Sequence, residues 1–208
     1  MADYTFFTNP MSRGQIARWA LHEAGVSYEQ VLVDWAHKPD ALIAANPMGK
    51  VPTIIHHAPG GDRVVTEAAA ICAYLAHTNT AANLGPTDQE AADYYRWLFF
   101  AAGPIESAVM ARALKLEVSK QQEGMVGWGS YDRVVETLDG LLSGRQFVCG
   151  DRFTMADVYV GSQVDWGLTF GTLPPLPSFA AYAERLQARE AYKAAKQIDN
   201  ALIAEAKA

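Results

Sequence analysis

Short apolar runs separated by turn residues predict a mixed α/β unit in the first third of the chain. Four runs have the aromatic and β-branched character of strands, the last two joined as a hairpin: residues 3–7, 28–33, 53–56 and 63–65. Apolar residues at helical spacing after Ser12 predict a helix that ends before Gly25. A short helical turn over 39–45 and an alanine-rich helix over 67–76 give the order β-α-β, then β-β-α.

From residue 87 onward the pattern is helical only. Two capping boxes, each a hydroxyl residue followed three positions later by Glu or Gln, predict helix starts at Thr87 and Ser119. We expect the first helix to run to about residue 118 and to be kinked by Gly103-Pro104, because proline removes a backbone donor. We expect the second helix to extend through 131–142.

A third capping box begins at Thr154, with Asp157 at its N3 position. Phe153 and Val158 have the spacing of the hydrophobic staple that accompanies such a box. We therefore expect Thr154 and Asp157 to be structural rather than ligand contacts. A proline-rich stretch precedes the last two helices, which are expected over 178–186 and 190–206.

These patterns predict two domains: an α/β domain over 1–78, a small polar linker over 79–86 and an all-helical domain over 87–208. Composition agrees, because 50% of the 208 residues are hydrophobic and 19% are charged, which is typical of a globular chain. The net charge of −6, without Lys/Arg blocks, disfavours nucleic-acid binding. No apolar run approaches the ~20 residues of a membrane-spanning helix, and no basic leader opens the chain.

The two cysteines, Cys72 and Cys149, cannot form a disulfide framework or a CxxC pair, so we expect a reduced, cytoplasmic protein. Cys72 falls on an apolar helix face and is expected in the core, whereas nothing near Cys149 would lower its pKa. His56 and His57 are neighbours on a strand, so they point to opposite faces and do not favour a shared metal ion.

Three segments have both a structural and a functional interpretation. Ser12 stands where a helix starts, so its hydroxyl either caps the helix or, beside unpaired backbone N–H groups, contacts an anion. Glu67 begins another helix, where the helix dipole already favours a carboxylate. Residues 94–100 are apolar nearly all round a helix, which indicates core packing or a subunit interface with one wall of a ligand pocket.

Taken together, the motifs resemble one family. They are x-P-x-S-R after the first strand, N-P-x-G-x-V-P-T before the third, T-E-A-A-A-I-C-A-Y-L at the last helix of the first domain, and D-R-F-T-M-A-D-V in the second domain. In this order, across essentially the whole chain, they are similar to the cytosolic glutathione S-transferases, of the bacterial type with a serine-type active site. The resemblance implies a thioredoxin-like α/β N-terminal domain followed by an all-α C-terminal domain.

The resemblance also implies roles for individual residues. Ser12 matches the hydroxyl that donates to the glutathione thiol, with Asn9 as the alternative, and no tyrosine stands at Phe6-Phe7 to take that role. Pro52 matches the family's cis proline, and Val51 before it would offer its backbone N–H and C=O to the cysteinyl unit of glutathione.

Four further positions match contacts to the two ends of glutathione. Lys38 matches a basic position that meets the glycine carboxylate, and Lys50 replaces a glutamine that contacts the ligand. Glu67 matches the acidic half of a glutamate–serine pair that holds the γ-glutamyl end, but the second position is Ala68. The missing hydroxyl is expected to weaken glutathione binding about tenfold or more, because a hydrogen bond to a charged group contributes roughly 1.5–3 kcal/mol.

The implied function is glutathione transfer to small hydrophobic electrophiles by a homodimer, with glutathione as co-substrate and no metal. The electrophile is expected to contact aromatic side chains of the helical domain, with these candidates: Trp97, Phe100, Trp166 and Phe170. A glutathione-dependent isomerase or dehalogenase of the same fold stays open, as does a non-catalytic binding protein, which Ala68 favours. A thiol-disulfide oxidoreductase is disfavoured because no cysteine lies near the first helix.

Overall fold

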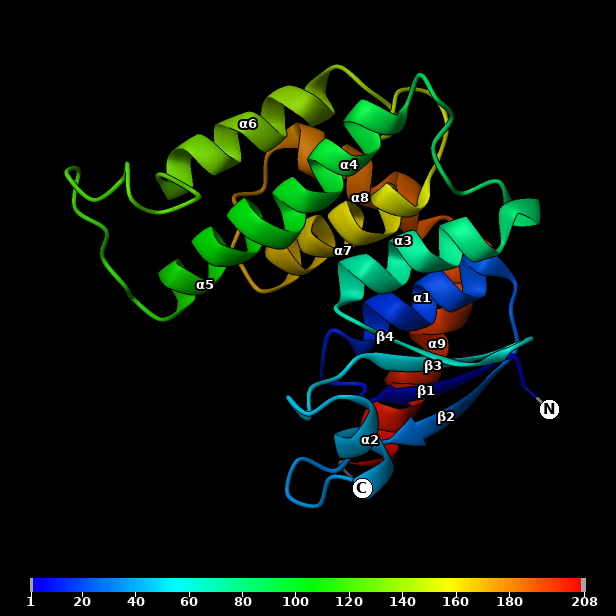
Figure 1. Cartoon of the computed structure of the whole chain (residues 1–208). Coiled ribbons are helices and arrows are strands. Elements are labelled where there is room, and N and C mark those ends of the chain that lie inside the picture. Colours follow the sequence, from blue (N-terminus) through cyan, green and yellow to red (C-terminus); the bar gives the residue numbers. More distant parts are fainter. Residues whose placement is uncertain (1, 207–208) are drawn as a thin grey trace. The chain divides into compact units, whose positions relative to one another are not determined.

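A computed structural model describes residues 2–206 (Figure 1). The described chain divides into two compact units. The first unit contains the residues up to Gly85 together with those from Ala188 onward, and the second contains Pro86–Gln187. The C-terminal helix thus belongs with the α/β unit, although the sequence alone groups it with the helices that precede it.

The first unit is built on a four-stranded mixed sheet in the order β2-β1-β3-β4. Its strands are β1 (Tyr4–Thr8), β2 (Tyr28–Leu32), β3 (Thr53–Ala58) and β4 (Gly61–Thr66). β1 and β2 are parallel, whereas β3 is antiparallel to both β1 and β4. Each strand and the β3–β4 hairpin confirm the predicted elements to within one to three residues.

Helices cover both faces of this sheet. Helix α1 (Gly14–Ala24) and helix α3 (Ala68–Thr78) lie on one face, and the short helix α2 (Asp40–Ala45) lies on the other (Figure 1). α1 buries its apolar positions and ends where Gly25 adopts a φ of 66°, a conformation that glycine adopts without strain. A single 3₁₀ turn, Thr80–Ala82, follows α3.

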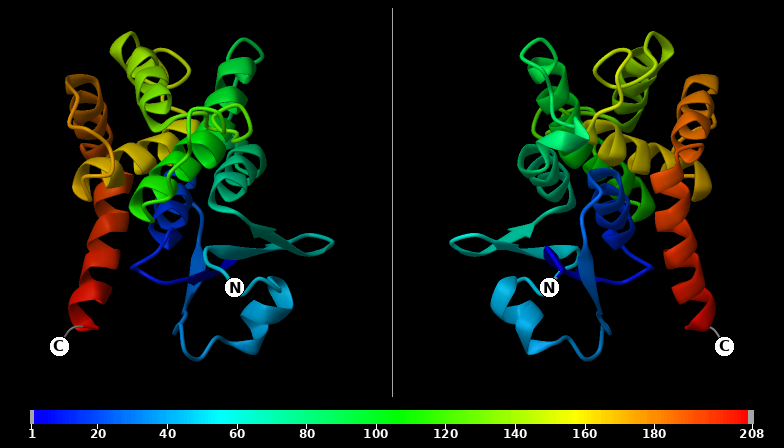
Figure 2. Two further views of the ribbon diagram at one scale, coloured as in Figure 1. Left: turned by 90° about the vertical axis from the view of Figure 1, so that its left-hand side faces the viewer. Right: turned by 90° about the vertical axis from the view of Figure 1, so that its right-hand side faces the viewer.

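Helix α9 (Glu190–Glu205) runs beside α1 in both views of Figure 2. A buried ion pair joins the two helices, because Nε of Arg18 donates to Oδ1 of Asp199 at 2.9 Å and neither side chain is exposed. A second, bidentate pair joins Arg189 to Glu23 at 2.6 and 2.7 Å. Removing one partner of a buried pair costs about 3–5 kcal/mol, so these contacts fix α9 in the first unit.

The second unit is helical throughout its described residues. Its α-helices are α4 (Ala91–Phe100), α5 (Glu106–Ala113), α6 (Tyr131–Ser143), α7 (Met155–Thr169) and α8 (Pro177–Gln187). The single kinked helix expected over 87–118 is instead α4 and α5 joined by a π-helical segment, Ala101–Ile105, that contains Pro104. The widened turn is the local response to a proline that supplies no backbone donor.

The helix expected to start at Ser119 is not formed. Residues 114–130 form turns, and Gln122 accepts hydrogen bonds from the amide and hydroxyl of Ser119 without a helix following. Helix α6 begins only after Ser130, whose hydroxyl accepts from the amide of Arg133. The capping spacing was present, but Gly124, Gly127 and Gly129 interrupt the segment that would have had to be helical.

The third capping box is confirmed, and it lies in a dry environment. The carboxylate of Asp157 is fully buried and accepts from the amides of Val148 (2.7 Å) and Thr154 (2.8 Å). It also accepts from the hydroxyls of Thr154 and Tyr182, at 3.0 and 2.8 Å. Burial raises the pKa of Asp157, and these donors oppose that shift. Asp157 thus ties the start of α7 to the preceding loop and to α8.

Among the described residues, none of the helices combines the length and the apolar composition that spanning a bilayer requires.

Candidate functional site

The sheet register brings four loops to one end of the first unit. Phe7 at the end of β1 pairs with Thr53 at the start of β3, and Thr53 pairs in turn with Thr66 at the end of β4. The segments that follow β1 and β4 and the segment that precedes β3 therefore share this end of the sheet. The segment after β2 joins them, because Leu32 pairs with Thr8.

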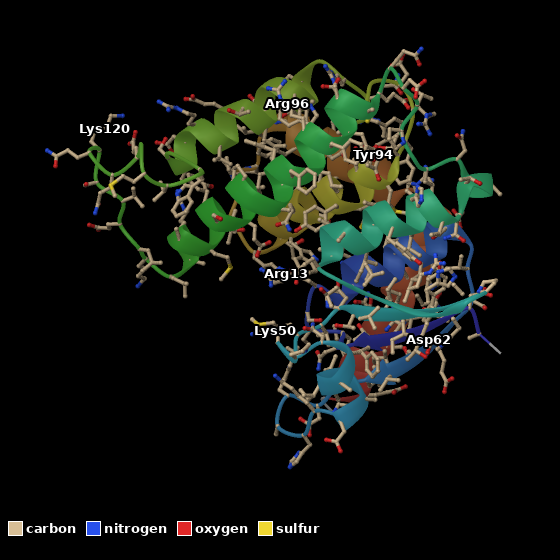
Figure 3. All side chains as sticks on the ribbon, in the orientation of Figure 1. Arg13, Lys50, Asp62, Tyr94, Arg96 and Lys120 are labelled. Atoms are coloured by element: carbon tan, nitrogen blue, oxygen red, sulfur yellow. The ribbon has the colours of Figure 1, made fainter. Side chains whose placement is uncertain are left out.

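Figure 3 shows the result within this unit: Arg13 and Lys50 lie at one end of the sheet, and Asp62 lies at the opposite end, in the hairpin. We call the end that carries residues 9–13, 38, 46–52 and 67–68 the loop end. The register thus brings Ser12, Val51 and Glu67, which are far apart in sequence, to one end of the unit.

Ser12 occupies the turn that begins α1. Its hydroxyl donates to the carbonyl of Asn9 at 2.6 Å and accepts from the amide of Gly14 at 2.9 Å. Ser12 thus satisfies the amide of the first residue of α1, although the N-cap position itself is Arg13, which makes no side-chain cap. A serine oxygen has a second lone pair but only one hydrogen, so this hydroxyl has to leave Asn9 before it can donate to a ligand.

Asn9 holds the shape of the same turn. Its Oδ1 accepts from the amide of Met11 at 2.8 Å, and its Nδ2 donates to the carbonyl of Val33 at 3.0 Å. The first bond closes the turn itself, and the second connects the loop after β1 to the loop after β2. Asn9 therefore has a structural role that the sequence motif did not reveal.

Position 14 requires glycine, because neighbouring atoms occupy the space that a side chain would need. A Cβ atom at this position would lie 2.1 Å from Oγ1 of Thr8, 3.0 Å from Oγ of Ser12 and 3.1 Å from the carbonyl of Asn9. Thr8 is fully buried, so it cannot turn away into solvent. The absence of a side chain at Gly14 thus lets α1 begin directly against the end of β1.

The segment before β3 is organised by Asn46, a buried side chain. Its Nδ2 donates to the carbonyl of Lys50 and to Oγ1 of Thr53, both at 3.1 Å, and its Oδ1 accepts from the amide of Met48 at 3.1 Å. Gly49 follows with a φ of 59°. These bonds close a tight turn that ends at Val51.

Val51 presents a free stretch of backbone. The Val51–Pro52 peptide bond is cis, which confirms the geometry that the sequence motif implied. The side chain of Val51 packs against the cluster of Phe7, Val33 and Leu42. In the described part of the chain, neither the N–H nor the C=O of Val51 has a hydrogen-bond partner. An exposed donor and acceptor on one residue match the needs of an extended peptide.

Two ammonium groups lie at the loop end. The side chain of Lys38 passes over Gly49, since its Nζ would be 3.2 Å from a Cβ at that glycine. Lys50, the residue after Gly49, is exposed. Neither lysine forms an ion pair with a carboxylate among residues 2–206. Both charges are therefore available to an anionic ligand.

Glu67 adopts a strained backbone at the start of α3. Its φ is 64° and its ψ is 119°, which non-glycine residues rarely adopt and which costs on the order of 1–3 kcal/mol. The carboxylate is exposed, and the first turn of α3 has no side-chain cap. Ala68 and Ala69 behind it are buried. The helix start thus offers unpaired amides to an anion, and Glu67 offers a carboxylate to a cation.

The arrangement can hold a small zwitterionic peptide. Its anionic groups would meet Lys38, Lys50 and the start of α3, its ammonium group would meet Glu67, and its backbone would pair with Val51. The positive end of α1 with the Ser12 hydroxyl lies at the same end of the sheet and favours a further negative charge.

The aromatic candidates of the second unit differ in exposure. Trp97 is buried on α4 and packs edge-to-face on Phe100, with ring centroids 5.4 Å apart. Trp166 is half-buried on α7, and Phe170, at the end of that helix, is 72% exposed. Within this unit Trp97 packs on Phe100, whereas Trp166 lies in the last turn of α7 and Phe170 comes directly after that helix.

The remaining titratable candidates have structural partners. His56 contacts the hydroxyl of Tyr74 at 2.8 Å, whereas His57 contacts Asp62 at 2.8 Å on the other face of the sheet, as predicted for strand neighbours. Burial raises the pKa of the Cys149 thiol to about 11, and Cys72 is fully buried. No group of three or more His, Cys, Asp or Glu side chains in the described chain is arranged to bind a metal ion.

Sequence reasoning did not reveal the structural roles of the residues that shape the loop end. Asn46 belongs to the N-P-x-G-x-V-P-T motif and Gly14 directly follows the x-P-x-S-R motif, but neither motif shows a buried amide network or a 2.1 Å approach. A turn-forming Asn three residues before a glycine was the available signal for Asn46. For Glu67, no residue type indicated its positive φ.

Comparisons with known proteins give a consistent result. The family models for the N-terminal and C-terminal domains of glutathione S-transferase match residues 2–77 and 97–190. Glutathione S-transferase 2 of Schizosaccharomyces pombe is 28% identical over 203 residues, which cover 84% of this chain and 86% of the relative.

Solved structures agree with these matches. A sphingomonad glutathione S-transferase complexed with glutathione is 28% identical, has a TM-score of 0.73, and the match covers 94% of this chain and 98% of that one. A glutathione transferase from Phanerochaete chrysosporium has a TM-score of 0.80 at 22% identity, covering 100% of this chain and 99% of that one, and so supports the fold.

Proposed function

Because the chain belongs to the glutathione S-transferase family, we propose that it binds glutathione at the loop end of its first unit and transfers the glutathione sulfur to small electrophiles. The observation that carries the proposal is the unpaired backbone of Val51, which lies at the same end of the sheet as Ser12 and Glu67. A tripeptide can extend that backbone edge while its ends meet the charged groups around it.

Each part of glutathione has a complementary group at the loop end. The cysteinyl N–H and C=O pair with the C=O and N–H of Val51. The glycine carboxylate meets the ammonium groups of Lys38 and Lys50, and the γ-glutamyl ammonium meets the carboxylate of Glu67. The γ-glutamyl carboxylate meets the amides at the start of α3, where Ala68 offers an N–H but no hydroxyl.

The chemical step needs a thiolate. A thiol with a pKa of about 8.5 is only a few per cent ionised at pH 7, and the thiolate is the nucleophile. Ser12 supplies a donor once its hydroxyl turns from the Asn9 carbonyl toward sulfur, and the start of α1 adds positive potential. Lowering the thiol pKa by about two units requires about 2.7 kcal/mol of differential stabilisation.

The thiolate then attacks an electrophilic carbon, forming a C–S bond as the leaving group departs with its electron pair. Half-buried or exposed aromatic side chains of the second unit, Phe100, Trp166 and Phe170, are the proposed contacts for the apolar part of the electrophile. Trp97 is buried and would act by holding Phe100 in place. The biological role that fits this chemistry is detoxification in the cytoplasm.

We also propose a homodimer. Tyr95 and Phe99 are one turn apart on α4 and are 49% and 65% exposed, although both are large aromatic residues. Such a pair on a helix surface is typical of an interface. The segment that looked apolar all round in sequence therefore divides into a buried face, with Tyr94, Trp97 and Leu98, and an outward face.

A second function, glutathione or peptide binding without catalysis, is favoured by two observations. Ala68 removes a hydroxyl from the γ-glutamyl subsite, and the Ser12 hydrogen is held by Asn9 at 2.6 Å. Isomerase and dehalogenase activities would use the same thiolate on other substrates, and product analysis distinguishes them.

The deciding experiment removes the Ser12 hydroxyl. Ser12→Ala should lower kcat with 1-chloro-2,4-dinitrobenzene by at least about tenfold, since a charge-assisted hydrogen bond is lost, while the glutathione Kd changes little. Because Ser12 also caps α1, Ser12→Thr, which keeps a hydroxyl, should retain activity if donation matters.

Ser143→Ala, on the second unit, is the matched control. Unchanged turnover in Ser12→Ala would leave Ser12 as a cap only and make Asn9 the next candidate. Glutathione binding without any turnover in the wild type would favour the non-catalytic function.

A further inference from the structure

The turn between β1 and α1 is held by a side chain that lies outside the motif around Ser12. Gln15, in the first turn of α1, folds back so that its Nε2 donates to the carbonyl of Pro10 at 2.5 Å. The N–H of the same peptide unit, that of Met11, donates to Oδ1 of Asn9 at 2.8 Å. Two side chains thus hold the Pro10–Met11 peptide unit, one at its carbonyl and one at its amide.

Lys196 of α9 determines which way the Gln15 amide points. Nζ of Lys196 donates to Oε1 of Gln15 at 2.7 Å. Because an ammonium group only donates and a backbone carbonyl only accepts, the amide oxygen has to face Lys196 and the amide nitrogen has to face Pro10. The two hydrogen bonds of Gln15 therefore support each other, and both are lost if its amide turns over.

Helix α9 holds Lys196 in place. Nζ of Lys196 lies 5.5 Å from the ring centroid of Tyr192, one turn earlier on α9, and Tyr192 packs edge-to-face on Trp19 of α1, with ring centroids 5.1 Å apart. The buried Arg18–Asp199 pair joins the same two helices within one turn of Lys196. Since α1 and α9 belong to one compact unit and lie side by side (Figure 2), a continuous set of contacts extends from α9 to the turn after β1.

The Ser12 hydroxyl has to change its partner for the proposed reaction, and the turn has to keep its shape while it does so. At present the hydroxyl donates to the carbonyl of Asn9 at 2.6 Å, and this bond is lost when the hydroxyl turns toward sulfur. The Gln15 bond is made to the next carbonyl, that of Pro10, and does not involve Ser12. It therefore remains when the Ser12–Asn9 bond breaks.

We propose that Gln15, oriented by Lys196, is a positioning residue for glutathione transfer that keeps the turn of residues 9–12 in place when the Ser12 hydroxyl turns toward sulfur. This inference rests on the proposed function, because it assigns Gln15 a role at the same site. Gln15 acts through the Pro10 carbonyl rather than by touching a substrate. Such a residue can control turnover, because a misplacement of about 1 Å can lower a rate about a hundredfold.

Two substitutions separate the two bonds of Gln15. Gln15→Met is similar in size and removes both bonds, whereas Gln15→Glu keeps an acceptor for Lys196 but leaves no donor for the Pro10 carbonyl. Both variants should lower kcat with 1-chloro-2,4-dinitrobenzene by about tenfold, while the glutathione Kd from calorimetry changes by less than about twofold. Lys196→Met should lower kcat by a smaller factor, about threefold, because Gln15 can still reach Pro10 but is no longer held there.

Matched controls lie on exposed positions of α9. Gln197→Met and Lys193→Met make the same two changes next to Lys196 and three residues before it. Lys193 pairs with Glu190 at 2.8 Å, on its own helix. Both controls should leave kcat, the glutathione Kd and the pH dependence unchanged.

The pH profile of turnover distinguishes positioning from a loss of stability. At saturating glutathione, kcat/KM for the electrophile rises through the pKa of the bound thiol. A misplaced Ser12 donor should raise this pKa in Gln15→Met by about 0.5 unit or more, whereas a variant that is only less stable keeps the wild-type profile.

The wild type shows which conclusion fails. If it transfers glutathione but Gln15→Met has an unchanged kcat, or a lower kcat with an unchanged pH profile, the role of Gln15 is overturned and the proposed function stands. Retained turnover in Gln15→Glu would also overturn this role, because the Pro10 bond would then be dispensable. A wild type without turnover would overturn the proposed function, and the role of Gln15 with it.

Discussion

Replacing Gly14 by alanine should destabilise the protein, although helix propensity alone predicts the opposite. Alanine is favoured over glycine in a helix by about 1 kcal/mol. At Gly14, however, the added Cβ would lie 2.1 Å from Oγ1 of Thr8, far inside van der Waals contact. Since Thr8 is β-branched and fully buried, the strain cannot be relieved by a rotamer change into solvent.

The magnitude follows from the two opposing effects. Overpacking of a well-packed site costs typically 1–3 kcal/mol, and the start of a helix benefits less than its middle from an alanine. We therefore expect Gly14→Ala to lose about 1–3 kcal/mol of unfolding free energy. Because the turn that holds Ser12 must shift, the variant should also lose transferase turnover.

A double-mutant cycle identifies the contact responsible. Thr8→Ala removes the obstructing oxygen, which has no hydrogen-bond partner among the described atoms. In the Thr8→Ala background, the loss of unfolding free energy caused by Gly14→Ala should therefore be smaller by at least about 1 kcal/mol. The rescue should be incomplete, because the added Cβ still lies 3.0 Å from Oγ of Ser12 and 3.1 Å from the carbonyl of Asn9. Urea unfolding at one fixed protein concentration provides the free energies.

Gly140→Ala is the matched control, because this glycine is inside α6 and nothing lies within 4 Å of its added Cβ. It should stabilise the protein by about 0.5–1 kcal/mol. The argument from the close approach is wrong if Gly14→Ala raises the unfolding free energy as this control does. It is also wrong if Thr8→Ala does not reduce the loss of unfolding free energy caused by Gly14→Ala.

Three further predictions concern other sites. Ala68→Ser should tighten glutathione binding up to about tenfold in calorimetry, because it restores a donor at the γ-glutamyl subsite. Asp157→Ala should lower the unfolding free energy by about 3 kcal/mol or more, since four buried donors lose their acceptor, while glutathione affinity of the folded protein is unchanged. Hydrogen bonds from Arg152 lower the pKa of Glu90 to about 2, below the usual 4.5, so wild-type stability should fall as the pH drops from about 4.5 to 2. Glu90→Gln should lack this part of the acid sensitivity, about 1 kcal/mol for this partly exposed pair.

Each of these predictions has a contrary result. Equal or weaker glutathione binding by Ala68→Ser would mean that the carboxylate is held elsewhere. A loss of glutathione affinity in Asp157→Ala without a fall in melting temperature, compared with the exposed control Asp151→Ala, would make Asp157 a ligand contact. Parallel pH profiles for wild type and Glu90→Gln would show that the Arg152 pair does not contribute.

Elements with a strong local pattern could be predicted from the sequence. The strands, the α1 helix and the start of α7 combine hydrophobic periodicity with turn or capping residues, so several signals agree. The prediction of a helix starting at Ser119 was wrong, because the capping spacing there was not supported by helix-forming residues after it. The membership of α9 could not be predicted, because the Arg18–Asp199 pair joins residues 181 positions apart.

The candidate site was predicted in its residue types but not in its geometry. The sequence indicated Ser12, Val51 and Glu67 through motifs, and the sheet register explains why these motifs share one end of the sheet. It did not show that Asn9 holds the Ser12 hydrogen, nor that Glu67 has a φ of 64°. Both depend on how backbone segments meet, which residue patterns specify only indirectly.

The ion pair between Arg18 and Asp199 has a consequence for how the protein is made. The first unit is interrupted in sequence by residues 86–187, which leave the ribosome before Asp199 does. The helical unit can thus form while the buried guanidinium of Arg18 still lacks its carboxylate. A chain that stops before residue 188 contains every residue of the loop end, yet it lacks both the helix that packs on α1 and the carboxylate that pairs with Arg18. Such fragments should be degraded rather than accumulate as small glutathione-binding proteins.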